Sequence, residues 1–188
     1  MFDGLPPSAA WRHAGGRDGF EVVFISSVRQ GWRFDGHTTV VEDGHPWTVR
    51  YTITVDRRWH TRRANVWAWS TAGARRRTVR GDGAGRWEVD GVRAPDLDGC
   101  LDVDLEASAC TNTFPVHRID TVPGRVVEAP AAYVRVDGLA VERLEQRYGC
   151  RAGNVYDYEA PAFDFACALH FDRTGLVLEY PGIASRVH

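Results

Sequence analysis

The fold class is decided by the stretch Trp47-Thr48-Val49-Arg50-Tyr51-Thr52-Ile53-Thr54-Val55. Apolar side chains occupy every second position, and polar side chains stand between them. Successive side chains of a strand point to opposite faces of a sheet, so the pattern predicts a strand with one buried and one solvated face. The turn Asp43-Gly44-His45-Pro46 precedes this strand and predicts a hairpin with an earlier strand over 38–42.

Similar short runs, rich in β-branched and aromatic residues, recur along the chain between glycine-rich turns. Segment 111–119 instead combines polar residues that suit a helix start with a proline, which predicts a single short helix. The chain is therefore predicted to be mostly β and to form one domain over residues 1–188. Further strands are expected at 20–25, 66–70, 78–80, 87–89, 101–105, 126–128, 132–136, 139–147, 155–159, 163–171 and 176–180.

Two local patterns bear on how the strands connect. The glycines of Gly81-Asp82-Gly83-Ala84-Gly85 are followed by a short β-like run and not by a helix, so they predict a hairpin tip rather than a phosphate cradle. Segments 49–57 and 165–173 both alternate and both end in Asp-Arg. Any two amphipathic strands share this period, so a roll of two similar halves and a roll of unrelated halves are both open.

The composition argues against nucleic acid as a partner. The formal charge is −2, and all 23 basic residues are arginine, so no global positive field attracts a polyanion. No segment reaches the ~18 apolar residues that a membrane span requires. The first residues lack the basic and apolar parts of a secretory signal. We therefore expect a cytoplasmic protein without a membrane span.

No motif of a known catalytic or metal site is present. The sequence has no Gly-x-Ser-x-Gly and no His-Glu-x-x-His, and its 7 histidines are scattered. Asp102 and Asp104 would project from one face of a strand, where they could bind a hard cation or act as paired carboxylates. Alternate aspartates are also typical of a solvated sheet face, which is the interpretation we favour. No catalytic residue, metal ligand or cofactor is predicted.

Two blocks, at 97–105 and 111–119, resemble a bacterial family described as putative glycolipid-binding proteins. The resemblance extends through Trp11, Gly85-Arg86-Trp87 and Gln146-Arg147-Tyr148. It implies a spiral β-roll, a long antiparallel sheet wrapped around one helix, similar in shape to bacterial lipoprotein carriers. The function of the family was itself inferred from shape, so the resemblance implies a class of ligand and brings no catalytic residues.

The aromatic residues suggest what such a roll holds. Trp and Tyr combine a large apolar area with one polar tip, so they line sites for amphipathic ligands as well as cores. We expect a non-enzymatic protein that holds a lipid or glycolipid in an apolar cavity between the curved sheet and the helix. The expected ligand-binding residues are Trp59, Asn112, Arg118, Tyr133, Tyr148 and Tyr180.

Two other functions stay open at this point. A hydrolase acting on a sugar or an ester would use Glu21, Asp102, Asp104, Asn112 and Arg118, and it requires a carboxylate with a perturbed pKa in a cleft. A homodimeric structural or interaction protein would pair the exposed edges of an open sheet. For Asn112, capping of the helix start is the favoured role, and contact with a ligand head group is the alternative.

Overall fold

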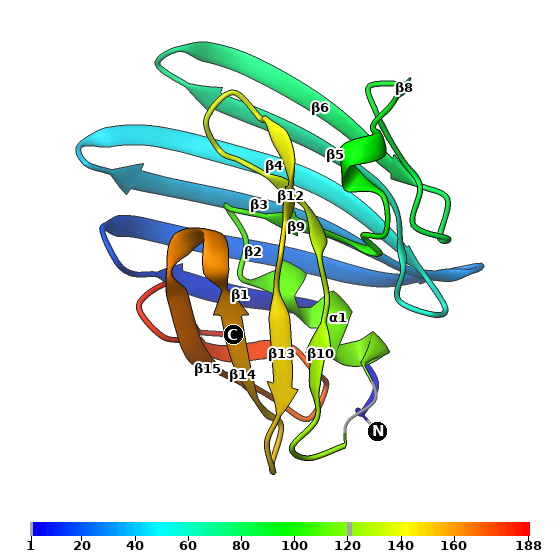
Figure 1. Cartoon of the computed structure of the whole chain (residues 1–188). Coiled ribbons are helices and arrows are strands. Elements are labelled where there is room, and N and C mark those ends of the chain that lie inside the picture. The colour runs from blue at the N-terminus through cyan, green and yellow to red at the C-terminus, as the bar shows by residue number, and fades with distance from the viewer. Residues whose placement is uncertain (1, 120–121) are drawn as a thin grey trace.

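The protein is an open roll of antiparallel strands that encloses one short helix (Figure 1). The computed structural model describes residues 2–119 and 122–188. One 14-stranded sheet has the order β10-β13-β14-β15-β16-β17-β1-β2-β3-β4-β5-β6-β7-β8. The predicted mostly β fold, with a long antiparallel sheet wrapped around a single short helix, is confirmed.

The elements of the large sheet follow the chain closely. In the first half they are β1 (Ser8–His13), β2 (Arg17–Val28), β3 (Gly31–Glu42), β4 (His45–Asp56), β5 (Thr61–Ser70), β6 (Gly73–Gly81), β7 (Trp87–Val89) and β8 (Val92–Arg93). In the second half they are β10 (Val126–Glu128), β13 (Arg147–Cys150), β14 (Val155–Ala160), β15 (Phe165–Phe171), β16 (Val177–Tyr180) and β17 (Ala184–Arg186). The predicted strand 139–147 is divided, because its first part, β12 (Val141–Leu144), pairs elsewhere.

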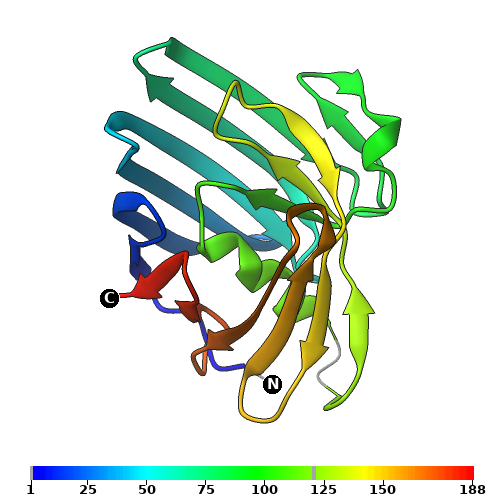
Figure 2. The same ribbon diagram turned by 60° about the vertical axis from the view of Figure 1, so that its left-hand side comes forward.

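The large sheet is continuous across the two ends of the chain. β1 pairs with β17 in antiparallel register, which places Trp11 opposite Arg186. The first half of the chain therefore extends the sheet in one direction, and the second half extends it in the other. Figure 2 shows how the two wings curve toward each other around the helix. The sheet ends at β8 and β10, so the roll stays open.

The turns and the alternation of β4 form as the sequence predicts. Asp43 and Gly44 join β3 to β4 with φ angles of 49° and 77°. Two positive φ values in a two-residue loop match the right-handed twist of the flanking strands. Trp47, Val49, Tyr51, Ile53 and Val55 are all buried on the inner face. One face of this strand is thus core and the other is wet, as predicted.

A close approach between β3 and β4 explains a glycine in the middle of a strand. Gly36 lies opposite Tyr51, and a Cβ atom at Gly36 would stand only 1.9 Å from Cζ of that ring. The ring therefore crosses β3 directly over Gly36. Its hydroxyl reaches Glu21 on β2 and donates a hydrogen bond of 2.5 Å. A side chain at position 36 would block this path.

A second, three-stranded sheet lies inside the roll and was not predicted. Its order is β12-β11-β9, where β9 is Asp102–Leu105 and β11 is Ala131–Val134. β9 and β11 are parallel, with Asp104 opposite Tyr133. All residues of β9 are buried, because the strand is covered on both faces. The prediction that Asp102 and Asp104 lie on a solvated sheet face is therefore wrong.

The similarity between segments 49–57 and 165–173, which both end in Asp-Arg, has a local cause at the aspartate. Oδ1 of Asp56 accepts the backbone N–H groups two and four residues later, and Oδ1 of Asp172 does the same. Asp82 forms this turn as well, within the hairpin tip predicted at 81–85, although the residues around it do not resemble the two segments. One recurrent turn accounts for the shared aspartate in the two segments.

Candidate functional site

Among the described residues, two hollows on the inner side of the roll contain expected ligand-binding residues. The larger has a volume of about 780 Å³ and lies at the end of helix α1 (Thr113–Arg118), where Trp59 and His117 line it. The other has a volume of about 420 Å³ and lies between the small sheet and the C-terminal strands. We call this second hollow the tyrosine cleft. Its principal lining residues are Asp104, Ser108, Asn112, Tyr133, Leu144, Tyr158, Phe163, Phe165 and Tyr180.

The wall of the tyrosine cleft is built from aromatic rings. Tyr158 on β14 and Tyr180 on β16 meet edge to face, with ring centroids 5.8 Å apart. Phe165 on β15 lies between them, at 6.3 Å from Tyr158 and 6.0 Å from Tyr180. Tyr133 on β11 packs against Phe163 with ring centroids 5.6 Å apart. Such tilted pairs are favoured by the ring quadrupoles, and they present a continuous apolar surface to the cleft.

The floor of the cleft is polar and centred on Asp104. Oδ1 of Asp104 accepts a hydrogen bond of 2.6 Å from the Thr111 hydroxyl, and Oδ2 accepts one of 2.6 Å from Nε2 of Gln146. The same Gln146 amide also donates to the Tyr158 hydroxyl at 3.0 Å. Burial raises the pKa of Asp104 above its ordinary value, and the two donors oppose that shift. The floor therefore links the small sheet to the aromatic wall.

Asn112 lies on this floor and does not cap the helix. It occupies the N-cap position of α1, but its side chain forms no capping hydrogen bond. Oδ1 instead accepts a hydrogen bond of 2.9 Å from the Tyr148 hydroxyl. The preceding residue, Thr111, is likewise engaged by Asp104. The predicted cap is wrong because a 3₁₀ turn over Cys110–Asn112 leads into α1 and turns these side chains toward the small sheet.

Arg118 and Asp102 form an ion pair beneath the cleft. A guanidinium nitrogen of Arg118, at the end of α1, donates to Oδ2 of Asp102 on β9. The Asp102 side chain is 2% exposed and that of Arg118 is 16% exposed. Neither residue lines the tyrosine cleft. The pair joins the helix to the small sheet, and the Arg118 guanidinium lies beside a buried carboxylate.

Glu21 holds the segment before the helix against the large sheet. Its buried carboxylate accepts hydrogen bonds from the Tyr51 and Ser108 hydroxyls and from the backbone N–H of Ala109. Burial raises the pKa of Glu21, and these donors oppose the shift. Ser108 lines the tyrosine cleft on its other side. This carboxylate therefore fixes one edge of the cleft floor without facing the cleft.

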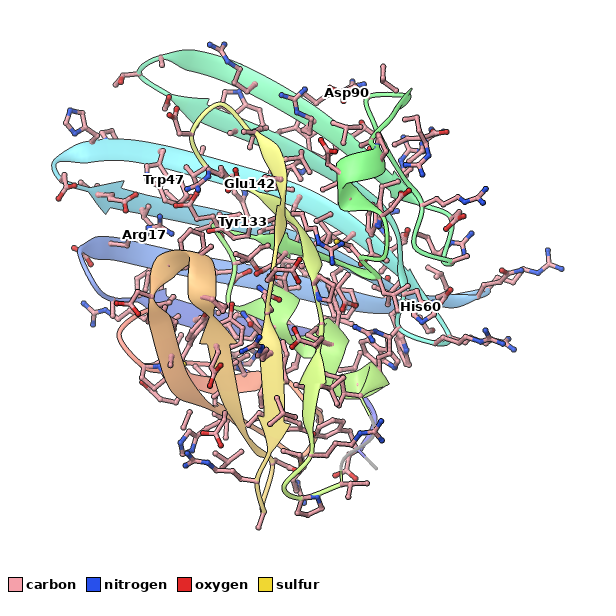
Figure 3. All side chains as sticks on the ribbon, in the orientation of Figure 1. Arg17, Trp47, His60, Asp90, Tyr133 and Glu142 are labelled. Carbon is pink, nitrogen blue, oxygen red and sulfur yellow. The ribbon has the colours of Figure 1, made fainter. Side chains whose placement is uncertain are left out.

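Charged residues form the outer rim of the cleft. The Arg17 guanidinium donates to Glu42 at 2.9 Å and to Glu106 at 2.8 Å, and it lies over the Trp47 ring at 5.3 Å. Arg135 lies over Phe163 at 5.6 Å, so the rim continues onto the aromatic wall. Figure 3 shows Arg17, Trp47 and Tyr133 gathered in the same region. Beyond this rim the surface is hollowed again along β4 to β6, by about 420 Å³.

Three of the six expected ligand-binding residues come together in the tyrosine cleft. Asn112, Tyr133 and Tyr180 line it, and Tyr148 lies behind Asn112. Trp59 lies in the other hollow, stacked on His117 with ring centroids 3.7 Å apart. Other residues of the cleft were not predicted from the sequence. The motifs Gln-Arg-Tyr at 146–148 and Tyr-Glu at 158–159 could have indicated this region. These missed residues are Arg17, Glu106, Tyr158, Phe163 and Phe165. Gln146 does not line the cleft but donates to Asp104 at its floor.

Two further findings concern metals and membranes. Within residues 2–119 and 122–188, no group of three or more His, Cys, Asp or Glu side chains is placed to hold a metal ion. No described helix has the length and apolar character needed to cross a membrane.

The geometry defines a class of protein, an open β-roll whose inner side carries an aromatic cleft with a buried polar floor. The chain belongs to a family described as "Putative glycolipid-binding", whose model matches residues 8–186. It is also similar to the crystal structure of a DUF1089 family protein from Pseudomonas aeruginosa. The two chains are 30% identical with a TM-score of 0.78, and the match covers 100% of this chain and 98% of the other. No curated protein matches the chain.

Proposed function

We propose that this protein binds a glycolipid or a related amphipathic lipid in the tyrosine cleft and does not transform it. The observation that carries the proposal is the convergence of aromatic rings over a buried polar floor. A volume of about 420 Å³ fits the range of roughly 300–1,000 Å³ that is typical of small-molecule sites. The name of the family agrees with this class of ligand.

Each part of the cleft suits one part of an amphipathic ligand. The rings of Tyr158, Phe165 and Tyr180 offer faces on which an acyl chain or the apolar face of a sugar can pack. The Asn112 carbonyl oxygen is already used by Tyr148, so its amide N–H groups are the donors available to a ligand hydroxyl. The charged rim beyond Arg17 and Glu106 favours a polar group at the mouth.

A titration with monomeric octyl β-D-glucoside tests this proposal. Phe163 is 42% exposed at the mouth, so Phe163→Ala removes a packing surface with little risk to the core. Phe24→Ala is the matched control, because Phe24 is 63% exposed on the outer face of β2. Loss of one aromatic contact of about 1 kcal/mol weakens binding about fivefold. Equal affinity of both variants and the wild type would place the ligand elsewhere.

A hydrolase is the second candidate, and one observation favours it. Asp104 is a carboxylate in a cleft, and burial raises its pKa, which is the condition that this function requires. Against it, both oxygens of Asp104 are held by Thr111 and Gln146, and Glu21 and Asp102 do not line the cleft. Turnover of nitrophenyl glycosides or esters that Asp104→Asn abolishes would establish the enzyme, and its absence in the wild type would remove it.

The dimer and the cytoplasmic location also stay predictions. The open sheet has two edges, β8 and β10, which expose Val92 and Val126. An equivalent edge could cover either of them by isologous pairing. Light scattering that returns the mass of one 21.0 kDa chain would exclude the dimer. Fractionation of the organism that encodes the protein would test the location.

A further inference from the structure

A further hollow lies at the opposite end of the roll from the rim of the tyrosine cleft. It has a volume of about 470 Å³ and lies among the turns β2–β3, β4–β5 and β6–β7. Figure 3 shows His60 at the opposite end of the long strands from Arg17 and Trp47. Its charged and polar lining includes Arg29, Asp56, Arg57, Arg58, His60 and Arg62.

The turn between β4 and β5 holds its arginines in place. Oδ1 of Asp56 accepts the N–H of Arg58 at 2.8 Å and the N–H of His60 at 3.1 Å. Between these residues Trp59 adopts a left-handed conformation with φ of 65°, and its ring is anchored by the stack on His117. The backbone that carries Arg57 and Arg58 is therefore fixed by one partly buried ring and one carboxylate.

The neighbouring turns close the hollow around this segment. Nδ1 of His60 is 2.9 Å from the Gly83 carbonyl oxygen, and this contact connects the β4–β5 turn to the β6–β7 turn. Arg57 donates to the Arg29 carbonyl oxygen at 3.3 Å, and this hydrogen bond connects the β4–β5 turn to the β2–β3 turn. A Cβ atom at Gly83 would stand 2.0 Å from a guanidinium nitrogen of Arg62, so the glycine makes room for that side chain. Three turns distant in sequence thus converge on one basic hollow.

The charge in this hollow is strongly positive, although the whole chain carries −2. Four arginines face one aspartate. Arg62 lies 3.6 Å from that aspartate, Asp56, whereas Arg29, Arg57 and Arg58 form no ion pair with any described residue. Like charges repel when they are gathered, and a multivalent anion removes that repulsion. The planar guanidinium also matches the geometry of phosphate oxygens.

We infer that this hollow is a binding site for a phosphate group, either free in solution or carried by a lipid head group. The inference is independent of the tyrosine cleft, because the two sites share no lining residue. It also differs from the nucleotide cradle that the glycines at 81–85 could have suggested, since arginine side chains and not a helix N-terminus supply the donors.

The test compares two probes and two double variants. The probes are inorganic phosphate and vesicles of phosphatidylcholine with about one third phosphatidylglycerol. Arg57→Gln with Arg58→Gln removes two charges from the hollow, and Arg76→Gln with Arg80→Gln removes two exposed charges from β6 as a control. Each charge-assisted hydrogen bond contributes about 1.5–3 kcal/mol, so the first double variant should weaken binding at least about tenfold. The control should retain the wild-type affinity.

The outcomes distinguish the source of the phosphate. Saturable binding of inorganic phosphate supports a site for soluble phosphate groups, and binding of the vesicles alone supports a lipid head group. Binding of neither probe, or equal binding by the two double variants, overturns the inference. A phosphate titration of the wild type followed by amide NMR needs no variant. Shifts confined to residues 29–30, 56–62 and 83 support the site, and shifts elsewhere contradict it.

Discussion

Tyr51→Phe is the most informative single change, because it deletes one atom from the contact that joins the large sheet to the helix segment. The Tyr51 hydroxyl is fully buried and donates to Glu21 at 2.5 Å. After the change Glu21 keeps the donors Ser108 and Ala109 and loses the third. A hydrogen bond to a charged group contributes about 1.5–3 kcal/mol, and a neutral one about 1 kcal/mol.

The loss of stability caused by Tyr51→Phe should depend on pH. Burial raises the pKa of Glu21 in the folded protein, so the stability that its protonated form contributes is fully present below the unfolded pKa and is lost as the pH rises through the folded pKa. Deleting a donor to the carboxylate raises that pKa further. We expect the mutation to lower the free energy of unfolding by between about 1 and about 2 kcal/mol, and by more at pH 8 than at pH 5.

Urea unfolding followed by tryptophan fluorescence measures both values. Tyr133→Phe is the matched control, since the Tyr133 hydroxyl forms no hydrogen bond with any described residue and its loss should cost less than about 0.5 kcal/mol. A loss for Tyr51→Phe that is below this value at both pH conditions, or that is larger at pH 5 than at pH 8, would refute the role assigned to the contact.

Three further changes follow from the packing. Gly36→Ala should destabilise the fold by at least about 2 kcal/mol, because the new Cβ meets the Tyr51 ring, and an unchanged melting temperature would contradict this. His13 is buried and its pKa is lowered to about 4, so the unfolded chain binds a proton at a higher pH than the folded chain does. From pH 7 to pH 5 the wild type should therefore lose about 2 kcal/mol more stability than His13→Leu. An equal dependence of stability on pH in the two proteins would contradict the lowered pKa of His13. Arg118→Leu should cost about 3 kcal/mol by leaving the Asp102 carboxylate unpaired, and Asp102→Asn in the same chain should recover most of that loss in urea unfolding.

The large sheet could be predicted from sequence because its information is local. The alternation in β4 and the Asp-Gly turn before it each fix a conformation over a few residues. The short helix at 111–119 was predicted from its own residues, and the family resemblance added the roll that encloses it. The boundaries of short strands, such as the division of 139–147, depend on which partner strand is available and cannot be read from the run itself.

The inner sheet and the cleft floor could not be predicted, because they too depend on partners from other parts of the chain. Asp102 and Asp104 have the spacing of a solvated face, and only the partners Arg118 and Gln146, supplied by distant segments, make their burial possible. Asn112 has the residue type of a helix cap, but Tyr148 competes for its side chain. Local preference yields to a tertiary hydrogen bond when both groups are buried.

Native mass spectrometry of the protein purified from the organism that encodes it tests the central claim most directly. If the tyrosine cleft binds a lipid or glycolipid, the wild type carries added mass of a lipid that is released on activation in the gas phase. The Phe24→Ala protein carries the same added mass, and the Phe163→Ala protein carries less of it. Wild-type protein that is free of bound lipid, or lipid retained equally by Phe163→Ala, would contradict the account.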